Sequence, residues 1–275
     1  MQLIKYKANC SGIGKIIVKD SNITEKQSEK ITELEAKEKL TSKQQETLNG
    51  LIKKRDTPVE LSTGAKSEVD KWIKEKLFKR RKQVKTKYMD KGNSMEDWSI
   101  DFIAKQLNYK MLIKNSKRET NEFVTGEADV LPKDCCIDAK NSWDHDTFPF
   151  FETEFNKDYY WQGQGYMWLF DRKDYKLCYV LSNTPESLIL SEAKSYCFKN
   201  NIEFTDEIFN KFYSKMTYDD LPDSMRLKKF EFKRSEKDIE LIKTSVNLCQ
   251  EYVNNKIEQY ITEGLITKDY VLTLN

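Results

Sequence analysis

The sequence predicts an α/β protein in which a central mixed sheet is flanked by helices. Helical and strand-like patterns alternate along the chain, as such a sheet requires. Aromatic residues make up 12% of the 275 residues, whereas disordered chains are poor in them, so the polar surface should enclose a core. No segment approaches the ~18 consecutive apolar residues of a membrane span, so we expect a soluble protein with no membrane partner.

Residues 22–61 are expected to form a helical insertion within the fold. Charged residues dominate from Asn22 to Arg55, and apolar positions are sparse there. Thr41 followed by Gln45 marks a helix start, so the stretch should fold as a hairpin of two helices. Its role stays open between a solvated hairpin, an interaction arm and the main body of a helical adaptor protein.

The rest of the chain supplies the predicted sheet and its covering helices. Apolar spacing predicts helices over 62–77, 94–107, 158–170, 185–199 and 206–215, with a long final helix from 235 to about 261. Alternating or continuous short apolar runs predict strands over 109–113, 122–130, 135–140, 176–181 and 227–232, with a turn over 131–134. A helix, three strands, a helix and a strand in this order indicate a mixed sheet.

The charge balance conceals one basic segment. Lys and Arg total 47 and Asp and Glu 45, so the net charge of +2 gives no whole-chain attraction to nucleic acid. Residues 71–87, however, hold nine basic residues and one acid. A solvated helix face is one explanation, but the segment lacks i,i+4 acidic partners, so DNA phosphate contact competes with it. The residues predicted to bind DNA here are Lys79, Arg80, Arg81 and Lys82.

Histidine and cysteine usage excludes several kinds of site. The single histidine, His145, removes His-rich zinc sites and paired-histidine mechanisms. The six cysteines include no CxxC pair, and Cys135 and Cys136 are adjacent, which suits neither zinc nor an iron–sulfur cluster. We therefore expect reduced thiols, a cytoplasmic location, and chemistry carried by carboxylates and lysines.

Three carboxylates fall at positions where they can converge. Glu96 lies on the predicted helix before the strands, Asp129 ends one strand, and Asp138 lies on the next strand two residues before Lys140. Residues i and i+2 of a strand face the same side, so Asp138 and Lys140 project together. Carboxylates at a sheet edge suit Mg²⁺, with Mn²⁺ as a substitute, and the carbonyl of Ala139 could add a ligand. The alternative is an ordinary set of surface acids.

These residues belong to a longer series of motifs. Gly92-x-x-x-Glu96, Thr125-Gly-Glu-Ala-Asp129, Asp138-Ala-Lys140 and the helix with Gln162-Gly-Gln164 occur in this order. The series resembles the PD-(D/E)XK nuclease superfamily, and most closely the branch that contains lambda exonuclease and the YqaJ-type viral recombinases. The resemblance covers about residues 1–20 and 62–200.

The resemblance implies a restriction-endonuclease-like core in a single nuclease domain over residues 1–275. Carried over by position, Glu96, Asp129 and Asp138 are metal-site acids, Lys140 is the catalytic lysine, and Gln162 supports the site. Ser11 matches a serine that meets DNA phosphate. The sequence departs from the branch in three places. Asp138 stands where glutamate is usual, and the arginine expected before Ser11 is absent, which Lys5 or Lys7 replaces only in part. The helical insertion at 22–55 is not part of the common core.

The implied activity is that of an Mg²⁺-dependent deoxyribonuclease. The branch suggests a 5′-to-3′ exonuclease on double-stranded DNA ends that produces single strands for recombination, of phage or prophage origin and acting in a bacterial cytoplasm. A single-strand-annealing recombination protein is a candidate partner, and a homo-oligomer is a candidate assembly. The alternatives are an endonuclease or a single-strand or flap nuclease of the same fold, and a catalytically silent DNA-binding or assembly protein.

Overall fold

The computed structural model describes residues 4–274, which divide into two compact units. One unit comprises residues 4–6, 15–79 and 240–274, and the other comprises residues 7–14 and 80–239. Each unit is therefore assembled from segments that are distant in the sequence. Whether the chain acts as the single nuclease domain expected over residues 1–275 stays a prediction.

The first unit is helical. Its helices are α2 (Glu25–Glu35), α3 (Ser42–Asp56), α4 (Thr63–Leu77), α10 (Lys268–Leu272) and most of α9 (Glu236–Thr262). Helices α4 and α9 lie together, since the Tyr252 hydroxyl donates to Asp70 Oδ1 at 3.0 Å. The chain's beginning joins them through the ring of Tyr6, which meets the ring of Trp72 edge-on at 4.9 Å. The long C-terminal helix, predicted over 235–261, is confirmed.

The predicted helical hairpin is also confirmed. Helices α2 and α3 each begin with a capping box, in which a threonine and a glutamine three residues later exchange side-chain and backbone hydrogen bonds. The second box pairs Thr41 with Gln44, one residue before the glutamine expected from the sequence. The hairpin buries an apolar cluster of its own, formed by Ile31, Leu34 and Leu48.

The second unit contains two three-stranded mixed sheets in place of one central sheet. In the first, β1 (Ala8–Asn9) runs parallel to β3 (Val124–Gly126), and β2 (Glu119–Thr120) runs antiparallel to β3. In the second, β4 (Cys135–Asn141) runs parallel to β5 (Asp174–Val180), and β6 (Leu227–Lys233) runs antiparallel to β5. The α/β class and its mixed strand directions are as predicted.

Three predicted elements differ from the structure: one strand is absent, one is shorter and one helix begins earlier. Residues 109–113 form no strand, because Met111 and Ile113 are each 69% exposed and only Leu112 is buried. The expected strand 122–130 is regular only over β3, and beyond it single bridges join Val130 to Lys114 and to Ile137. The helix expected from residue 94 begins earlier, as α5 (Lys87–Gln106), because the Thr86 side chain caps it.

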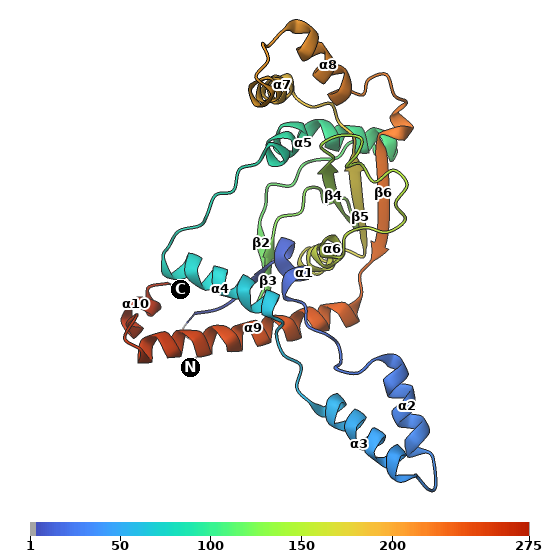
Figure 1. The fold of residues 1–275 in the computed structure, drawn as a ribbon, viewed down its shortest axis with the longest axis vertical. Coiled ribbons are helices and arrows are strands. Elements are labelled where there is room, and N and C mark those ends of the chain that lie inside the picture. Colours follow the sequence, from blue (N-terminus) through green and yellow to red (C-terminus); the bar gives the residue numbers. More distant parts are fainter. Residues whose placement is uncertain (1–3, 275) are drawn as a thin grey trace. The chain divides into compact units, whose positions relative to one another are not determined.

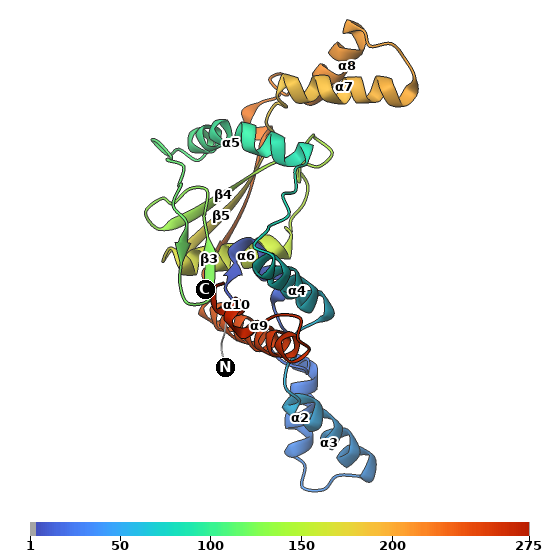
Figure 2. The ribbon, with the colours of Figure 1, turned by 90° about the vertical axis from the view of Figure 1, so that its left-hand side faces the viewer.

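Helices α5 and α6 (Lys157–Leu169) cover opposite faces of the β4–β5–β6 sheet, as Figures 1 and 2 show. Residues alternate between the faces of β4, so Cys135 and Ile137 pack with Ile103 of α5. Cys136, Asp138 and Lys140 therefore face α6. The unit also contains η1 (Cys10–Gly12), the first residues of α1 (Ile13–Ile16), the helices α7 (Glu186–Asn200) and α8 (Asp206–Met216), and η2 (Asp223–Met225).

Two glycines allow α6 to lie close against its neighbours. A Cβ added at Gly163 would stand 2.6 Å from Phe232 Cζ of β6, and one at Gly165 would stand 2.4 Å from Ile13 Cδ1. Any larger residue would push the helix outward. The glycines of the Gln-Gly-Gln-Gly motif thus fix how near α6 comes to β6 and to the segment of η1 and α1.

Two further expectations concern the whole chain. All six cysteines are free and buried, in keeping with the reduced thiols expected. Within residues 4–274, no helix combines the length and the apolar character needed to cross a membrane.

Candidate active site

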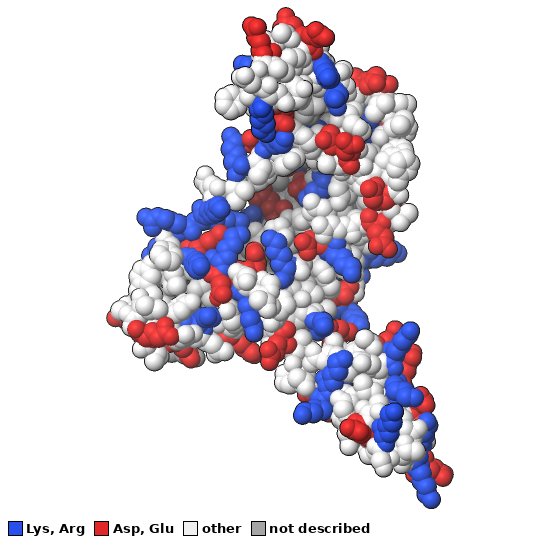
Figure 3. All heavy atoms as spheres, in the orientation of Figure 1, with Lys and Arg blue, Asp and Glu red and all other residues white. Residues whose placement is uncertain are grey.

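A cavity of about 560 Å³ in the second unit brings together four of the predicted site residues. Glu96 enters it from α5, Ala139 and Lys140 from β4, and Asp129 from the segment after β3. Figure 3 shows acidic side chains at the base of a hollow beside β4 and below α5. Residues that are up to 44 positions apart in the sequence thus meet in one depression of the surface.

Asp129 is held at the edge of β4 by the backbone. The N–H and C=O of Ile137 both bond to Val130, at 2.9 and 3.2 Å, so this edge of β4 faces away from β5. Ala139 lies two residues on and faces the same edge, and its N–H donates to Asp129 Oδ2 at 2.8 Å. The N–H and C=O of a strand residue point to the same side. The carbonyl of Ala139 therefore faces the open edge as well, next to the Asp129 carboxylate.

Asp138 and Lys140 form an ion pair, with 2.6 Å between Lys140 Nζ and Asp138 Oδ2. Asp138 is 1% exposed while the Lys140 side chain is 25% exposed, and among the described residues no hydrogen bond to the Asp138 carboxylate is found apart from this ion pair. A buried carboxylate with unused lone pairs is costly unless a cation stands beside it. The lysine supplies one charge and leaves oxygen positions that a metal ion fits.

The pKa values at the site follow from the burial and closeness of Asp129, Asp138 and Lys140. Burial, followed by the nearby charge of Asp138, holds the pKa of Asp129 well above its usual range. Burial alone would lower the pKa of Lys140, but the charges of Asp138 and Asp129 outweigh burial and raise it. Lys140 therefore stays protonated while the two aspartates repel each other, and a divalent cation between them would relieve that repulsion.

Helix α5 is tied to the end of β4 by a polar contact at Asn141, which lines the cavity. Ser99 Oγ donates to Asn141 Oδ1 at 2.7 Å, and Ser182 Oγ donates to the same oxygen at 2.8 Å. Glu96 lies one helical turn before Ser99 and so faces the cavity. Its carboxylate bonds to Lys114 Nζ at 2.8 Å. Lys114 is thus the group that binds the Glu96 carboxylate in this structure.

The oxygen-rich donor set suits Mg²⁺, which prefers carboxylate and carbonyl ligands. Asp129, Asp138 and the carbonyl of Ala139 fit such an ion, and Glu96 would complete the set by leaving Lys114. Within residues 4–274, no three histidine, cysteine or acidic side chains are arranged as metal ligands. The predicted acids therefore line one cavity without forming a metal-ligand arrangement, and the metal site stays a prediction.

Gln162 lies on the face of α6 that covers Asp138. It is 6% exposed, and its Nε2 donates to the Tyr166 hydroxyl at 3.3 Å. Burial, and then the charge of Asp138, raise the pKa of Tyr166, so this hydroxyl stays protonated beside the acids. Gln164 points elsewhere, since its amide bonds to the backbone of Lys233 and Ser235. Support of the site by Gln162 stays a prediction.

The predicted DNA-binding residues lie outside the lining of the cavity. Ser11 is exposed in η1, and its N–H donates to Asn9 Oδ1 at 3.4 Å. Arg80, Arg81 and Lys82 are exposed in an extended segment between α4 and α5, so they do not form a solvated helix face. Lys79 belongs to the first unit, where its Nζ donates to Thr273 Oγ1 at 3.4 Å.

The sequence analysis missed a buried lysine beside the cavity. Lys91 of α5 is fully buried, and its Nζ donates to the carbonyls of Trp143 and Ser182 at 2.9 and 2.8 Å. Burial lowers its pKa to about 8, with Arg226 adding to this effect. Lys91 and Ser99 are two turns apart on the same helix face, and this spacing is the one signal in the sequence of an inward lysine.

Two aromatic residues of the cavity wall were also missed. Tyr88 and Trp143 both line the cavity, and their rings meet edge-on with centroids 5.3 Å apart. Lys87 Nζ stands 4.8 Å from the centroid of the Trp143 ring. Aromatic rings and a cation at the rim of an acidic cavity are suited to a base and its phosphate. Neither residue belongs to a motif, so position in the fold alone identifies them.

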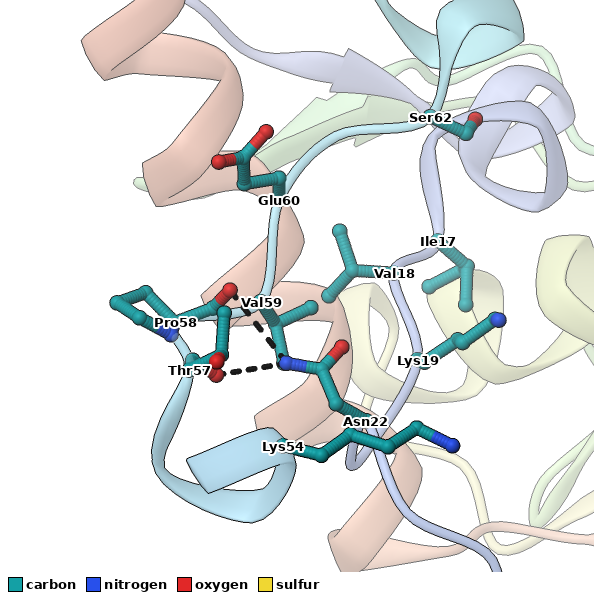
Figure 4. Close-up of a pocket in the computed structure, with 10 residues that line it drawn as sticks. All are labelled: Ile17, Val18, Lys19, Asn22, Lys54, Thr57, Pro58, Val59, Glu60 and Ser62. Carbon is teal, nitrogen blue, oxygen red and sulfur yellow. Dashed lines mark hydrogen bonds between the residues drawn. The ribbon is translucent and has the colours of Figure 1, made fainter. Parts of the chain in front are cut away.

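A second cavity, of about 580 Å³, lies at the root of the hairpin in the first unit. Figure 4 shows its lining, in which Asn22 Nδ2 donates to Thr57 O at 2.6 Å and reaches Pro58 O at 3.5 Å. Glu60 is its single acid. The hydrogen bonds of Asn22 join the two ends of the insertion, so we assign this cavity a structural role.

Solved structures similar to this chain are exonucleases. A crystal structure of a phage-related exonuclease from Haemophilus somnus 129PT is 27% identical, with a TM-score of 0.63 over 94% of this chain and 97% of that chain. The alkaline exonuclease LHK-Exo from Laribacter hongkongensis shares the fold, at 12% identity and a TM-score of 0.54 over 94% and 93%. So does LHK-Exo in complex with dAMP, at 14% and 0.51 over 74% and 87%. No family model and no curated protein matches the chain.

Proposed function

We propose, from the premise that this chain has the fold of the PD-(D/E)XK exonucleases of the lambda exonuclease and YqaJ type, that it is a Mg²⁺-dependent deoxyribonuclease. The observation that carries the proposal is the edge of β4. There the Asp129 carboxylate bonds to the N–H of Ala139, and Asp138 and Lys140 form an ion pair in the adjoining position. An acidic donor set with a protonated lysine beside it suits hydrolysis of a phosphodiester.

In this proposal, different residues bind the metal and orient the attacking water. Asp129, Asp138 and Glu96 would hold the metal with the carbonyl of Ala139, and the bound metal would neutralise charge on a phosphate oxygen and acidify water. Lys140 Nζ lies where it can orient the attacking water and stabilise charge that develops on the phosphate. Asp138 holds Lys140 in place, so the lysine points into the cavity without a conformational change.

The finer parts of the proposal concern the substrate. We infer a 5′-to-3′ exonuclease on double-stranded ends, which would leave single strands for recombination by an annealing protein. Its support is the resemblance of the motifs to this branch, together with the 27% identity to a phage-related exonuclease over nearly the full length of both chains. The basic segment, with Arg80, Arg81 and Lys82 exposed, is suited to the DNA backbone.

Digestion of labelled DNA tests the proposal. Linear duplex labelled at the 5′ or the 3′ end is incubated beside covalently closed circular DNA and linear single strands, with Mg²⁺, with Mn²⁺ and with EDTA. We expect early release of the 5′ label, intact circles, activity with either metal and none with EDTA. Cleavage of the circles would favour the endonuclease, and degradation of single strands alone the single-strand nuclease. Duplex binding with no cleavage under any metal would identify a silent DNA-binding protein and refute the proposal.

A further inference from the structure

Lys114 is a second lysine of the acidic site, and no motif includes it. Its Nζ lies 2.8 Å from Glu96 Oε2 and 3.8 Å from Asp97 Oδ1. The side chain of Glu96 is 28% exposed and that of Asp97 is 87% exposed, so the pair with Glu96 is the more sheltered. One of the three predicted metal-site acids is therefore bound by a lysine ammonium.

The backbone holds Lys114 in this position. The N–H of Asn115 donates to the carbonyl of Asp129 at 2.8 Å, and its side-chain amide donates to the carbonyl of Ala128 at 2.9 Å. Lys114 itself pairs with Val130 in an isolated antiparallel bridge. The segment that carries Asp129 thus also fixes Lys114, and a chance surface contact would not have this support.

We propose that Lys114 exchanges partners when the site is loaded: it binds Glu96 in the metal-free protein and a DNA phosphate oxygen once a divalent cation takes Glu96. The inference rests on the proposed function. Without metal, Lys140 balances Asp138 and Lys114 balances Glu96. A divalent cation supplies two charges to the same acids, so the ammonium of Lys114 loses its electrostatic role there. It then stands, still charged, beside the position of a phosphate at the metal.

This exchange has two opposite consequences. Lys114 competes with the cation for Glu96, so it weakens binding of metal to the DNA-free protein. The released ammonium binds the phosphate, so it strengthens binding of DNA to the metal-loaded protein. Reciprocal coupling of this kind is a free energy shared by the two ligands. A Lys114–Glu96 pair that persisted in the metal-loaded protein would not predict the metal-dependent gain in DNA affinity.

Binding measurements with three variants test the exchange. K114Q removes the charge, K114R keeps it, and K117Q is the matched control, because Lys117 is 76% exposed and pairs with Glu119 instead. Mn²⁺ affinity of the DNA-free protein is measured from the electron paramagnetic resonance signal of free Mn²⁺. Affinity for a dye-labelled duplex is measured by fluorescence anisotropy in Ca²⁺ and in EDTA, with a gel to verify that the DNA stays intact.

We expect K114Q to bind Mn²⁺ about two- to five-fold more tightly, the size of one partly exposed ion pair. It should bind duplex about two- to five-fold more weakly in Ca²⁺ and equally well in EDTA. K114R and K117Q should behave as the wild type does. Unchanged or weaker Mn²⁺ binding in K114Q, or an equal loss of DNA affinity with and without Ca²⁺, overturns the exchange. A wild-type protein that binds neither Mn²⁺ nor DNA refutes the proposed function instead.

Discussion

The backbone N–H of Ala139 donates a hydrogen bond to the carboxylate of Asp129 at 2.8 Å, so the register of β4 and the geometry of the acidic site are set by the same contact. The bond fixes one carboxylate oxygen, Oδ2, and Oδ1 takes no part in it. A substitution of Asp129 that keeps the accepting oxygen therefore separates the effect of the hydrogen bond from the effect of the charge.

Asp129→Asn keeps an oxygen that accepts from Ala139 but removes the charge. The raised pKa of Asp129 means that its ionised form is disfavoured in the folded state, so at neutral pH the charge costs stability in the absence of metal. We expect the metal-free variant to melt about 2–4 °C higher than the wild type, as about 1 kcal/mol gives in a domain of this size. Mg²⁺ should raise the Tm of the wild type alone.

Calorimetric melting with and without Mg²⁺ checks this prediction, and Asp97→Asn is the control because Asp97 follows Glu96 in α5 and is 87% exposed. A variant that Mg²⁺ still stabilises as much as it does the wild type would remove Asp129 from the metal site.

Lys140→Ala should lower Mg²⁺-dependent degradation of linear duplex by about 10²- to 10⁴-fold, the usual contribution of a group that positions or deprotonates the nucleophile. The rate of release of acid-soluble nucleotide measures the loss. Lys173→Ala, which changes an exposed lysine just before β5, should leave the rate unchanged. Retained cleavage in a pure, folded Lys140 variant would rule out its catalytic assignment.

The lowered pKa of the buried Lys91 predicts how the free energy of unfolding changes with pH. Its pKa is about 8 in the folded protein against 10.5 when unperturbed, so between these values the unfolded chain binds more protons. The free energy of unfolding of the wild type should therefore increase as the pH rises from about 8 to 10.5. Lys91→Met should lack this gain and lose about 2–4 kcal/mol at pH 7.5, because two buried carbonyls lose their donor.

Urea unfolding at several pH values measures the difference between the wild type and Lys91→Met. The control is Lys105→Met, on the same helix, whose lysine is 72% exposed and pairs with Asp223. A difference that is constant from pH 8 to 10.5 would mean that Lys91 titrates normally in the folded protein.

The basic segment predicts a change in the salt dependence of DNA binding. Replacing Arg80, Arg81 and Lys82 together by alanine should weaken duplex binding and reduce the slope of log K against log[salt] by about 2–3, if each contacts one phosphate. A matched loss of charge at Lys26, Lys39 and Lys43, all exposed on the hairpin, should not change the slope. Equal slopes in the two triple variants would show that Arg80, Arg81 and Lys82 do not contact the DNA phosphates.

The hairpin of α2 and α3 should be dispensable for folding and cleavage. Asn22 already meets Thr57 at 2.6 Å, so a short Gly-Ser linker can replace residues 23–56 without strain at the ends. The hairpin has its own apolar cluster, so its removal exposes little of the remaining core. We expect a shift in Tm of a few degrees at most and an unchanged rate of DNA degradation; loss of cleavage would assign the hairpin to the DNA-binding surface.

Local periodicity accounts for the parts of the fold that the sequence predicted. The i,i+2 relation of Asp138 and Lys140 survives in the structure because β4 is regular along its whole length. The two helix starts of the hairpin depend on threonine caps, which act within three residues. Such short-range rules identify single elements and the faces that they bury.

Longer-range contacts account for what was missed. Residues 109–113 have the short apolar run of a strand, yet a strand needs a partner, and the edge of β4 is already bridged by Val130. Lys91 could not be recognised as buried, because its acceptors are the carbonyls of Trp143 and Ser182, far along the chain. Lys114 is likewise linked to Glu96 through a bridge that no periodicity reveals.

The edge of β4 also has a consequence for finding distant relatives of this chain. One residue inserted between Asp138 and Lys140 would turn Lys140 from the α6 face to the α5 face, so the Asp-x-Lys spacing tolerates no change. The turn over 131–134, in contrast, is partly or fully exposed and can lengthen while Val130 keeps its bridge to Ile137. A search pattern that fixes Asp138-x-Lys140 and leaves the gap after Asp129 variable would therefore follow the physics of the site more closely than one with a fixed gap.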